Sequence, residues 1–342
     1  MRAAVISGQG SIEFLEVPEP TPAPGGLVVD IAVCGICGTD VHAYAHGGPY
    51  PATLCGHEWS GTVSAVAGDV RSVSEGDRVS VAILPACGAC AECRAGLTDW
   101  CTTATMSLVN DAAGSPHGAF APRIAVSADR VVAVPAALDD ESAAMVEPAT
   151  VAYHGVRHAG IRLGDTVVVQ GAGPIGAFAL QWARLCGAGS VVVVEPSPSR
   201  AALARLLGAD LVVDPAGSAA AIAELTRGLG ADVVVECAGI PTTIQSAVDL
   251  VRRGGRVAVI GLSDLPATIQ PSVWLMKEVT VRGSVAYVRG EFEPCIAMLA
   301  SGRITARPIH TSTVALEDIG HAFDLLARGV AGETKILVRP SA

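Results

Sequence analysis

Two short stretches near the start of the chain combine side chains that bind metals and move protons. Residues 34–42 read Cys-Gly-Ile-Cys-Gly-Thr-Asp-Val-His, and residues 56–58 read Gly-His-Glu. Cys37 can supply a soft anionic ligand, and His57 can supply an imidazole nitrogen. One cysteine and one histidine, completed by an acidic residue or water, form the kind of open tetrahedral site in which zinc does chemistry. The two stretches therefore predict a catalytic zinc centre.

Each of these residues also has a simpler interpretation. A cysteine is often a small buried hydrophobe, a single histidine is often a core or surface residue, and the C-x2-C spacing of Cys34 and Cys37 also occurs in redox pairs. None of these interpretations explains why Thr39, His42 and Glu58 stand at fixed offsets nearby. We expect the Thr39 hydroxyl to reach a metal-bound substrate and His42 to take a proton onward.

A second metal site is predicted by four cysteines in one short segment. They have the spacing C-x2-C-x2-C-x7-C and are Cys87, Cys90, Cys93 and Cys101. Four thiolates leave no open position, so we expect a closed, structural zinc site. The rival is an iron–sulfur cluster, but the bacterial ferredoxin pattern needs x3 before its last cysteine and a proline after it. Here Thr102 follows, and the acidic charge of the chain disfavours a zinc ribbon that binds nucleic acid.

The composition is that of a folded enzyme rather than a disordered or membrane protein. With 342 residues, 50% hydrophobic and 16% charged, the chain can bury the cores of two domains. Its formal net charge of -10 argues against a nucleic-acid partner. No apolar run reaches the roughly eighteen residues of a membrane span, and the amino terminus turns polar at Ser7, too soon for a signal peptide. We expect a cytoplasmic protein whose ten cysteines bind metal or lie buried.

The elements that must position the metal ligands are mostly strands. Residues 1–33 and 59–81 alternate short apolar runs with proline and glycine, which predicts a small β-barrel. A helix is expected over residues 138–158, because acidic residues at 139–141 suit the positive end of a helix dipole. Within that helix, Glu147 precedes a proline in apolar surroundings.

From residue 165 the pattern changes to alternating strands and helices. The strand 166–170 is followed by Gly171-Ala-Gly173-Pro-Ile-Gly176 and then by a helix, and the strand 191–194 ends at Glu195. The glycine pattern alone is weak. Between a strand and a helix, with an acid about twenty residues on, it is a dinucleotide-binding fingerprint. The glycines let the backbone approach a pyrophosphate at the amino terminus of the helix.

Further alternation predicts a doubly wound parallel sheet of about six strands. The additional strands are expected at 210–213, 232–236, 256–260 and 279–285, with helices at 219–229 and 241–251. The tail is expected to add a helix through 295–300, a short strand near Ile309, a helix at 316–327 and a strand at 335–338. The predicted domains are 1–149, with a zinc lobe at about 86–102, then 150–287, and a return of 288–342 to the first domain.

Nearly the whole chain resembles the zinc-dependent medium-chain dehydrogenases, which include alcohol, sorbitol, butanediol and threonine dehydrogenases. The motifs that carry the resemblance are Cys-Gly-Thr-Asp-Val-His at 37–42, Gly-His-Glu at 56–58 with Gly61, the four-cysteine lobe, and 171–176 with Glu195. The resemblance implies an α/β fold with a GroES-like barrel domain and a Rossmann domain. It also implies NAD, two zinc ions per chain, a small-molecule alcohol or ketone substrate, and a homodimer or homotetramer.

The resemblance also implies roles for individual residues. Cys37 and His57 look like catalytic-zinc ligands, and Glu58 or Glu147 like an exchangeable third ligand, so Glu58 has a catalytic as well as a ligand role. Thr39 resembles the hydroxyl of the family's proton relay and His42 its outer base, linked through the cofactor ribose. The residues implied in cofactor binding are Gly171, Gly173, Pro174, Ile175, Gly176, Glu195 and Arg200. The cysteines that match no ligand position, and are expected to be structural, are Cys34, Cys55, Cys186, Cys237 and Cys295.

Substrate and cofactor choice are implied less directly. Glu147 stands where simple alcohol dehydrogenases have a cysteine, which places the chain nearer the polyol and diol branch. Tyr287 stands where the sorbitol branch has an arginine, with Arg289 close by. The nominated pocket residues are Tyr44, His46, Trp59, Trp274, Tyr287 and Arg289. Glu195 favours NAD because it can accept hydrogen bonds from ribose hydroxyls and would repel a 2′-phosphate. Arg200 could bind that phosphate, although in this family a basic residue there commonly accompanies NAD.

Three other functions are compatible with parts of the sequence. A zinc-free reductase of the same fold should lack Cys37 and His57, which are both present. A lyase or epimerase that uses transient oxidation would share every motif. A non-enzymatic dinucleotide-binding protein could keep the fold but would not need the relay residues. The expected function is hydride transfer between NAD(H) and a secondary alcohol, diol, polyol or cyclic alcohol or ketone.

Overall fold

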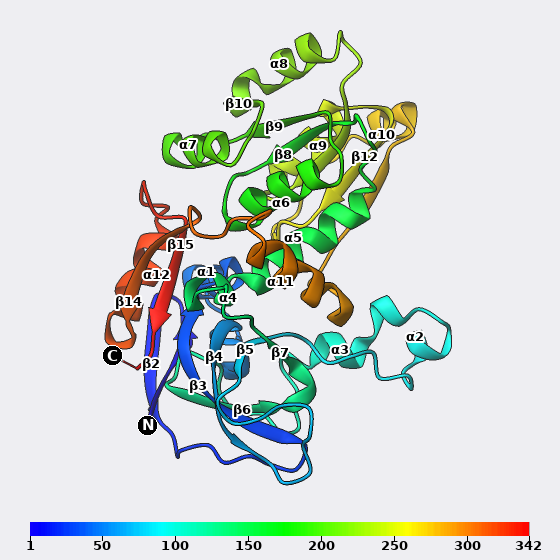
Figure 1. Ribbon diagram of the computed structural model, residues 1–342. Helices are drawn as coiled ribbons and strands as arrows, with labels where there is room; N and C mark the ends of the chain where they lie inside the picture. The colour runs from blue at the N-terminus through cyan, green and yellow to red at the C-terminus, as the bar shows by residue number, and fades with distance from the viewer. Residues whose placement is uncertain (342) are drawn as a thin grey trace. The chain divides into compact units, whose positions relative to one another are not determined.

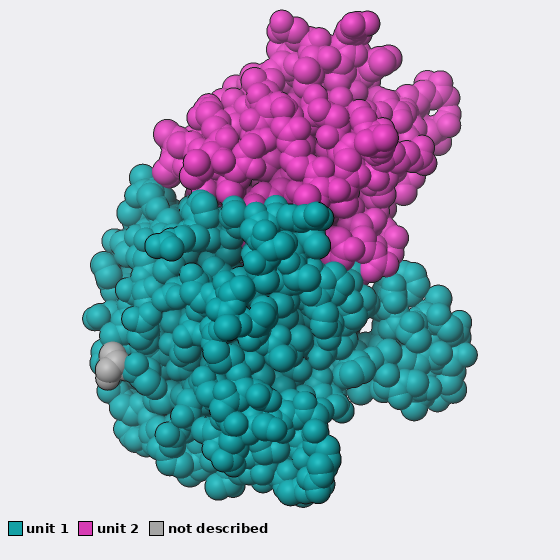
Figure 2. All heavy atoms as spheres, viewed as in Figure 1, with its two compact units in different colours: residues 1–147, 287–342 teal, residues 148–286 magenta. Residues whose placement is uncertain are grey.

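The computed structural model describes residues 1–341 and divides the chain into two compact units (Figure 2). Unit 1 consists of Met1–Glu147 together with the segment that begins at Tyr287, and unit 2 consists of Pro148–Ala286. No helix within residues 1–341 is both long and apolar enough to cross a membrane.

Unit 1 is built on a seven-stranded sheet in the order β14-β15-β3-β4-β5-β7, with β6 also paired to β3 (Figure 1). The strands are β3 (Gly26–Gly35), β4 (Glu58–Val66), β5 (Arg78–Val81), β6 (Arg123–Ser127), β7 (Val131–Ala133), β14 (His310–Ala315) and β15 (Lys335–Arg339). A separate hairpin joins β1 (Arg2–Gly8) to β2 (Ser11–Glu16). The predicted β-rich domain is therefore confirmed, and β15 extends its sheet by antiparallel pairing with β3.

The core of the barrel is made of large apolar side chains from segments far apart in the sequence. Trp59, Phe120 and Phe323 are each at most 2% exposed and belong to one cluster. Tyr44 belongs to the same cluster: its ring lies 5.1 Å from that of Phe323, and its hydroxyl donates to Asp324 at 2.9 Å. The expectation that Tyr44 lines the substrate pocket is therefore wrong, because its side chain is used to join the first helix to the C-terminal helix.

The helices of unit 1 are short. They are α1 (Gly38–His46), α2 (Ala91–Arg94), α3 (Thr102–Met106), α4 (Asp140–Ala144), α11 (Phe292–Ala300) and α12 (Ile319–Ala327), with 3-10 turns η1 (Ala52–Leu54), η2 (Thr98–Trp100), η3 (Ala128–Arg130), η5 (Arg289–Glu291) and η6 (Leu316–Asp318). In the four-cysteine lobe, α2 stands apart from the barrel strands, in cyan in Figure 1. The strand expected near Ile309 is β14, and the helix expected from 316 is η6 followed by α12.

The single helix expected over residues 138–158 is two helices, α4 (Asp140–Ala144) and α5 (Val146–Ala159). Met145 between them has φ -88 and ψ 3. Pro148 explains the break, because proline has no N–H for the carbonyl of Ala144 and its ring crowds that carbonyl. Proline is tolerated in the first turn of a helix, so α5 can begin at Val146.

Unit 2 contains the predicted six-stranded parallel sheet, in the order β10-β9-β8-β11-β12-β13. Its strands are β8 (Thr166–Gln170), β9 (Ser190–Val194), β10 (Leu211–Val213), β11 (Ala231–Glu236), β12 (Val251–Val259) and β13 (Thr280–Gly283). The connecting helices are α6 (Pro174–Leu185), α7 (Pro198–Leu206), α8 (Ser218–Leu225), α9 (Pro241–Leu250) and α10 (Pro271–Lys277), with the 3-10 turn η4 (Pro215–Gly217). The chain order reverses between β8 and β11, the place where such sheets bind nucleotides.

Continuous valine runs form the central strands of this sheet. The runs at 167–169, 191–193 and 233–235 are at most 1% exposed, as expected for parallel strands covered on both faces. The helix expected to reach Leu229 ends at Leu225, because Arg227 and Gly228 adopt positive φ angles of 53 and 83. Strand β12 begins five residues earlier than the expected start at 256, and β13 is shorter than expected.

Candidate metal centres and nucleotide-binding loop

The amino terminus of α1 places Cys37 and Thr39 side by side. Cys37 caps the helix: its thiol accepts a hydrogen bond from the Thr39 amide at 3.4 Å, and the Asp40 carboxylate accepts one from the Cys37 amide at 3.0 Å. The Thr39 hydroxyl lies 3.6 Å from the Cys37 sulfur. A capping interaction thus fixes both side chains, and a hydroxyl stands next to a potential metal ligand.

His57, immediately before β4, is oriented by two oxygen atoms. Its Nδ1 lies 2.8 Å from the Leu54 carbonyl and 3.8 Å from the Asp40 carboxylate. Nδ1 therefore donates, which leaves Nε2 as the nitrogen that can bind a metal. Burial alone would lower the pKa of His57, but the negative charges of Cys37 and Asp40 outweigh it and raise that pKa. The Tyr50 hydroxyl in turn donates to Asp40 at 2.7 Å.

Three of the predicted ligands form a compact group. One ligand atom each from Cys37, His57 and Glu58 lie within 4.8 Å of one another. This thiolate, imidazole and carboxylate set fits a zinc ion with an open position. Glu147 lies outside that group but is only 4% exposed, and burial, followed by the charge of Glu58, raises its pKa to about 8. The structure thus brings together three of the four predicted residues and places the fourth nearby.

A buried lysine, which the sequence analysis did not identify, pairs with Glu58. Lys335, the first residue of β15, donates to the Glu58 carboxylate and to the Ile36 carbonyl at 2.9 Å. Both charged side chains are 2% exposed. Gly35 leaves room for this pair, because a Cβ there would lie 2.5 Å from the Glu58 carboxylate. A lysine at the start of an apolar strand was the only sequence signal for this contact.

The relay candidate His42 lies on α1, one turn after Thr39. Residues three apart on a helix share a face, so both side chains are on the same side of α1. The His42 ring stacks on that of His46 with centroids 4.3 Å apart, and His46 is exposed. His46, nominated as a pocket residue, thus packs on the outer side of the relay histidine.

The four cysteines of the lobe form a second group. The sulfur atoms of Cys87, Cys90, Cys93 and Cys101 lie within 4.8 Å of one another. Backbone amides donate to these sulfurs, among them Cys90 to Cys87 at 3.3 Å and Ala104 to Cys101 at 3.4 Å. Hydrogen bonds from Thr103 and from the amides of residues 89 and 90 lower the pKa of Cys87 to about 6. Four cysteine sulfurs gathered in one group fit a closed zinc site.

The glycine-rich loop of unit 2 is tightly packed where glycine is needed. A Cβ on Gly176 would lie 1.9 Å from the Gly171 carbonyl, and Gly171 itself has a φ of +85. Gly173, by contrast, has open space around its missing Cβ, and Pro174 begins α6 directly after it, followed by Ile175. The amino terminus of α6 is therefore open to an anionic group.

Glu195 lies at the end of β9 beside that loop. It is 6% exposed, and its two carboxylate oxygens accept hydrogen bonds from the amides of Ala172 at 2.7 Å and Ser197 at 2.8 Å. The Arg200 Nε lies 3.9 Å from the same carboxylate. The structure thus brings the glycine loop, the acid and the arginine together within unit 2.

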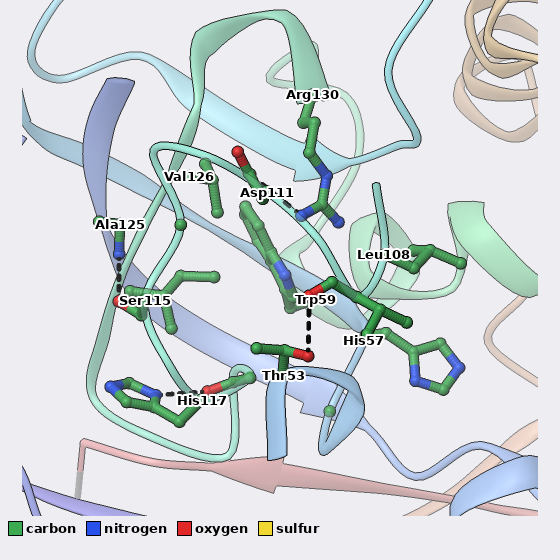
Figure 3. A pocket seen from close by; sticks show the side chains of 15 residues that line it. Thr53, His57, Trp59, Leu108, Asp111, Ser115, His117, Ala125, Val126 and Arg130 are labelled. Atoms are coloured by element: carbon green, nitrogen blue, oxygen red, sulfur yellow. Dashed lines mark hydrogen bonds and ion pairs between the residues drawn. The ribbon is translucent and has the colours of Figure 1, made fainter. Parts of the chain in front are cut away.

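Two cavities in unit 1 involve nominated pocket residues. A cavity of about 30 Å³ lies beside His57 and Trp59, next to a buried ion pair of 3.1 Å between Asp111 and Arg130 (Figure 3). A larger pocket of about 340 Å³ is lined by residues that include Tyr287 and Arg289. Trp59 is a barrel core residue, and in unit 2 the Trp274 indole donates to Gln245 at 3.0 Å.

The remaining cysteines lie outside both ligand groups. Cys34, Cys55 and Cys295 are buried, Cys237 is half-buried, and Cys186 is exposed after α6. The Asp40–Tyr50 pair, the Asp111–Arg130 pair and Lys335 are the polar groups near the metal ligands that sequence reasoning missed. They have no motif of their own, because each is recognisable only through a contact.

Known proteins resemble the chain along most of its length. The family model for the alcohol dehydrogenase GroES-like domain matches residues 23–136, and that for the zinc-binding dehydrogenases matches residues 174–301. The chain is 32% identical to sorbitol dehydrogenase of Halalkalibacterium halodurans, over 99% of both chains. It matches the crystal structure of 2R,3R-butanediol dehydrogenase of Bacillus subtilis with a TM-score of 0.86 and 31% identity, over 99% of both chains.

A second similar structure carries a nucleotide. The chain matches a putative zinc-binding dehydrogenase of Sinorhizobium meliloti bound to NADP with a TM-score of 0.86 and 31% identity, over 99% of both chains. Two family models match most of the sequence, and full-length relatives are 30% identical or more. Together they establish membership of a family as well as the fold. The chain belongs to the zinc-dependent medium-chain dehydrogenase family.

Proposed function

We propose that the chain is a zinc-dependent oxidoreductase that transfers hydride between NAD(H) and a secondary alcohol, diol, polyol or cyclic alcohol. The observation that carries this proposal is the compact Cys37, His57 and Glu58 group with the Thr39 hydroxyl 3.6 Å from the Cys37 sulfur. The dehydrogenase names of the relatives support it. They give no support to a lyase, an epimerase or a non-enzymatic dinucleotide-binding protein.

The residues of unit 1 supply metal binding and proton transfer. A zinc ion held in this group would supply a Lewis acid for the alcohol oxygen, and a nicotinamide would supply the hydride acceptor. Cys37 and the Nε2 of His57 hold the metal, and Asp40 and Leu54 keep the imidazole oriented. The Thr39 Oγ1 accepts the proton of the substrate hydroxyl, and His42 takes a proton onward from that relay. The four-cysteine lobe holds a second zinc ion with a structural role.

Proximity supports Glu58 rather than Glu147 as the third ligand. Only Glu58 belongs to the group within 4.8 Å. However, Lys335 pairs with the same carboxylate. Metal binding by Glu58 therefore competes with this buried ion pair.

We test the function with zinc-loaded protein and a panel of secondary alcohols, diols and polyols, following NADH absorbance. Cys37→Ser should abolish NADH formation and lower the zinc content. The matched control is Cys186→Ser, whose exposed thiol lies outside both ligand groups, and it should keep the activity. Fully metallated wild type that forms no NADH with any member of the panel would contradict the proposal.

NAD is the proposed cofactor rather than NADP. The amides of Ala172 and Ser197 keep the Glu195 carboxylate fixed, in a position to accept hydrogen bonds worth roughly 1.5 to 3 kcal/mol from ribose hydroxyls. A 2′-phosphate about 4 Å away would meet repulsion on the order of 4 kcal/mol per charge pair before screening. Arg200 already faces Glu195 at 3.9 Å. The similar structure bound to NADP shows that this cofactor also occurs among similar proteins.

We expect kcat/KM to favour NAD by at least about a hundredfold, or roughly 3 kcal/mol. Glu195→Ser should narrow this preference greatly, whereas Glu224→Ser, a change of an exposed acid in the same unit, should not. Equal or better use of NADP by the wild type would make Arg200 the dominant residue and overturn the assignment.

We also propose a homodimer or homotetramer in the cytoplasm. Apolar side chains at the end of unit 2 support association: Leu275, Met276 and Val285 are 75%, 71% and 76% exposed. A reducing compartment suits a lobe of four thiolates. Light scattering of the purified chain tests the oligomer, and a monomer at micromolar concentration would contradict it. Cell fractionation tests the location.

A further inference from the structure

The buried Asp40 carboxylate lies between a metal ligand and a tyrosine. Its Oδ1 accepts a hydrogen bond from the Tyr50 hydroxyl at 2.7 Å, and the same oxygen lies 3.8 Å from the Nδ1 of His57. Its Oδ2 accepts a hydrogen bond from the Cys37 amide at 3.0 Å, as part of the cap of α1. Asp40 is 0% exposed, so these protein groups rather than bulk water solvate its charge.

Tyr50 occupies the position at Oδ1 that His57 could take. A separation of 2.7 Å is typical of a strong hydrogen bond from a hydroxyl to a carboxylate, whereas 3.8 Å is too long for one from an imidazole. The His57 Nδ1 donates instead to the Leu54 carbonyl at 2.8 Å. A metal-binding histidine becomes more basic when this second nitrogen donates to a carboxylate. His57 therefore has a neutral acceptor, while the carboxylate that would make it more basic is engaged by Tyr50.

Separate elements anchor the two members of the Tyr50 and Asp40 pair. Tyr50 lies between α1 and η1, with Pro49 before it and Pro51 after it. A residue before proline is restricted to extended backbone, and the half-buried Tyr50 ring packs against the core of the barrel. Asp40 is fixed from the other side by the cap of α1. Because both side chains are anchored, their hydrogen bond sets the distance from Asp40 to His57.

We propose that Tyr50 is a positioning residue that acts on the metal ligand His57 through Asp40. Its hydroxyl engages Oδ1 and keeps the carboxylate from accepting the His57 Nδ1–H, so the imidazole stays a weaker donor to zinc. A weaker donor leaves the zinc ion a stronger Lewis acid for the alcohol oxygen, at a cost in zinc affinity. The inference rests on the proposed function, because it presumes that Cys37 and His57 bind zinc.

The test uses Tyr50→Phe, which removes only the phenol oxygen and frees Oδ1 of Asp40 for His57. Zinc affinity is measured on the full chain by competition with a chromophoric chelator, and Cys37→Ser identifies the zinc ion that belongs to this centre. In Tyr50→Phe that ion should bind about tenfold more tightly, a change of the size that such partners of metal-binding histidines produce. The kcat of the zinc-loaded variant with a secondary alcohol should fall at the same time. A variant that only loosened the fold would bind zinc more weakly.

The matched control is Tyr44→Phe, because Tyr44 also donates to a carboxylate, that of Asp324 at 2.9 Å, but lies outside the ligand group. This variant should leave the zinc affinity unchanged. A double-mutant cycle then tests the route of the effect. In an Asp40→Asn background Tyr50→Phe should no longer tighten zinc binding, because Tyr50 acts only through the carboxylate.

Two results would overturn the inference while leaving the proposed function intact. The first is unchanged or weaker zinc binding in Tyr50→Phe, and the second is the same tightening with and without Asp40→Asn. A different result would contradict the proposed function itself: if Cys37→Ser held as much zinc as the wild type, the centre would not bind zinc, and the inference would fail with it.

Discussion

Replacing Lys335 by methionine removes one member of a buried ion pair and leaves the other in place. The Lys335 and Glu58 side chains are each 2% exposed, and Lys335 also donates to the Ile36 carbonyl at 2.9 Å. In the variant, the buried Glu58 carboxylate has lost its cationic partner. The cost follows from this burial, because an uncompensated buried charge cannot be solvated.

The expected magnitude is about 3 to 5 kcal/mol, the usual cost of breaking a buried pair by removing one partner. A domain of roughly 150 to 250 residues loses about 2 to 4 °C in Tm per kcal/mol. Metal-free Lys335→Met should therefore unfold about 6 to 20 °C below the metal-free wild type. With zinc bound the difference should be smaller, because the cation then faces the Glu58 carboxylate.

The assay is thermal unfolding followed by circular dichroism, with and without zinc and at one heating rate. The matched control is Arg339→Met on the same strand, because the Arg339–Glu141 pair is exposed (51% and 30%) and joins at 2.9 Å. Exposed pairs contribute about 0 to 1 kcal/mol, so this variant should shift Tm by only a few degrees. The double variant Glu58→Gln, Lys335→Met should recover most of the loss. A loss in Lys335→Met no larger than in Arg339→Met would refute the reasoning.

Three further predictions concern the lobe, the relay and a buried histidine. Wild type should bind two zinc ions per chain, and Cys93→Ser should lose one and several kcal/mol of stability; unchanged zinc content in metal analysis would rule out the lobe site. Thr39→Val should keep its zinc but turn over about 10² to 10⁴ times more slowly; normal turnover with zinc bound would remove Thr39 from the relay. Burial lowers the pKa of His117. Below about pH 6.5 the unfolded chain therefore binds a proton at this histidine, whereas the folded chain does not. The stability of the folded chain consequently falls as the pH drops. Urea unfolding of His117→Gln between pH 7 and 5 should show a shallower fall, and an unchanged slope would exclude this contribution.

Sequence alone determined the features that depend on short-range geometry. The four lobe cysteines lie within one segment, and Cys37 and Thr39 share one helix cap, so their spacing already places their side chains together. The valine runs predicted the parallel sheet, because the same pattern of burial is repeated along each strand. The glycine loop predicted the edge of the sheet at which a nucleotide would bind. The family resemblance then supplied the two-domain fold, which the comparisons confirm.

Tertiary structure decided the contacts between residues that are distant in the chain. Lys335 pairs with Glu58, which is 277 positions away in the sequence. Tyr44 pairs with Asp324, which is 280 positions away, so Tyr44 is a core residue rather than the pocket residue that was expected. The break at Met145 and the position of Glu147 outside the compact ligand group also depend on the folded chain. The physical reason is that a local pattern specifies whether a side chain is buried, whereas packing of whole elements specifies which partner it is buried against.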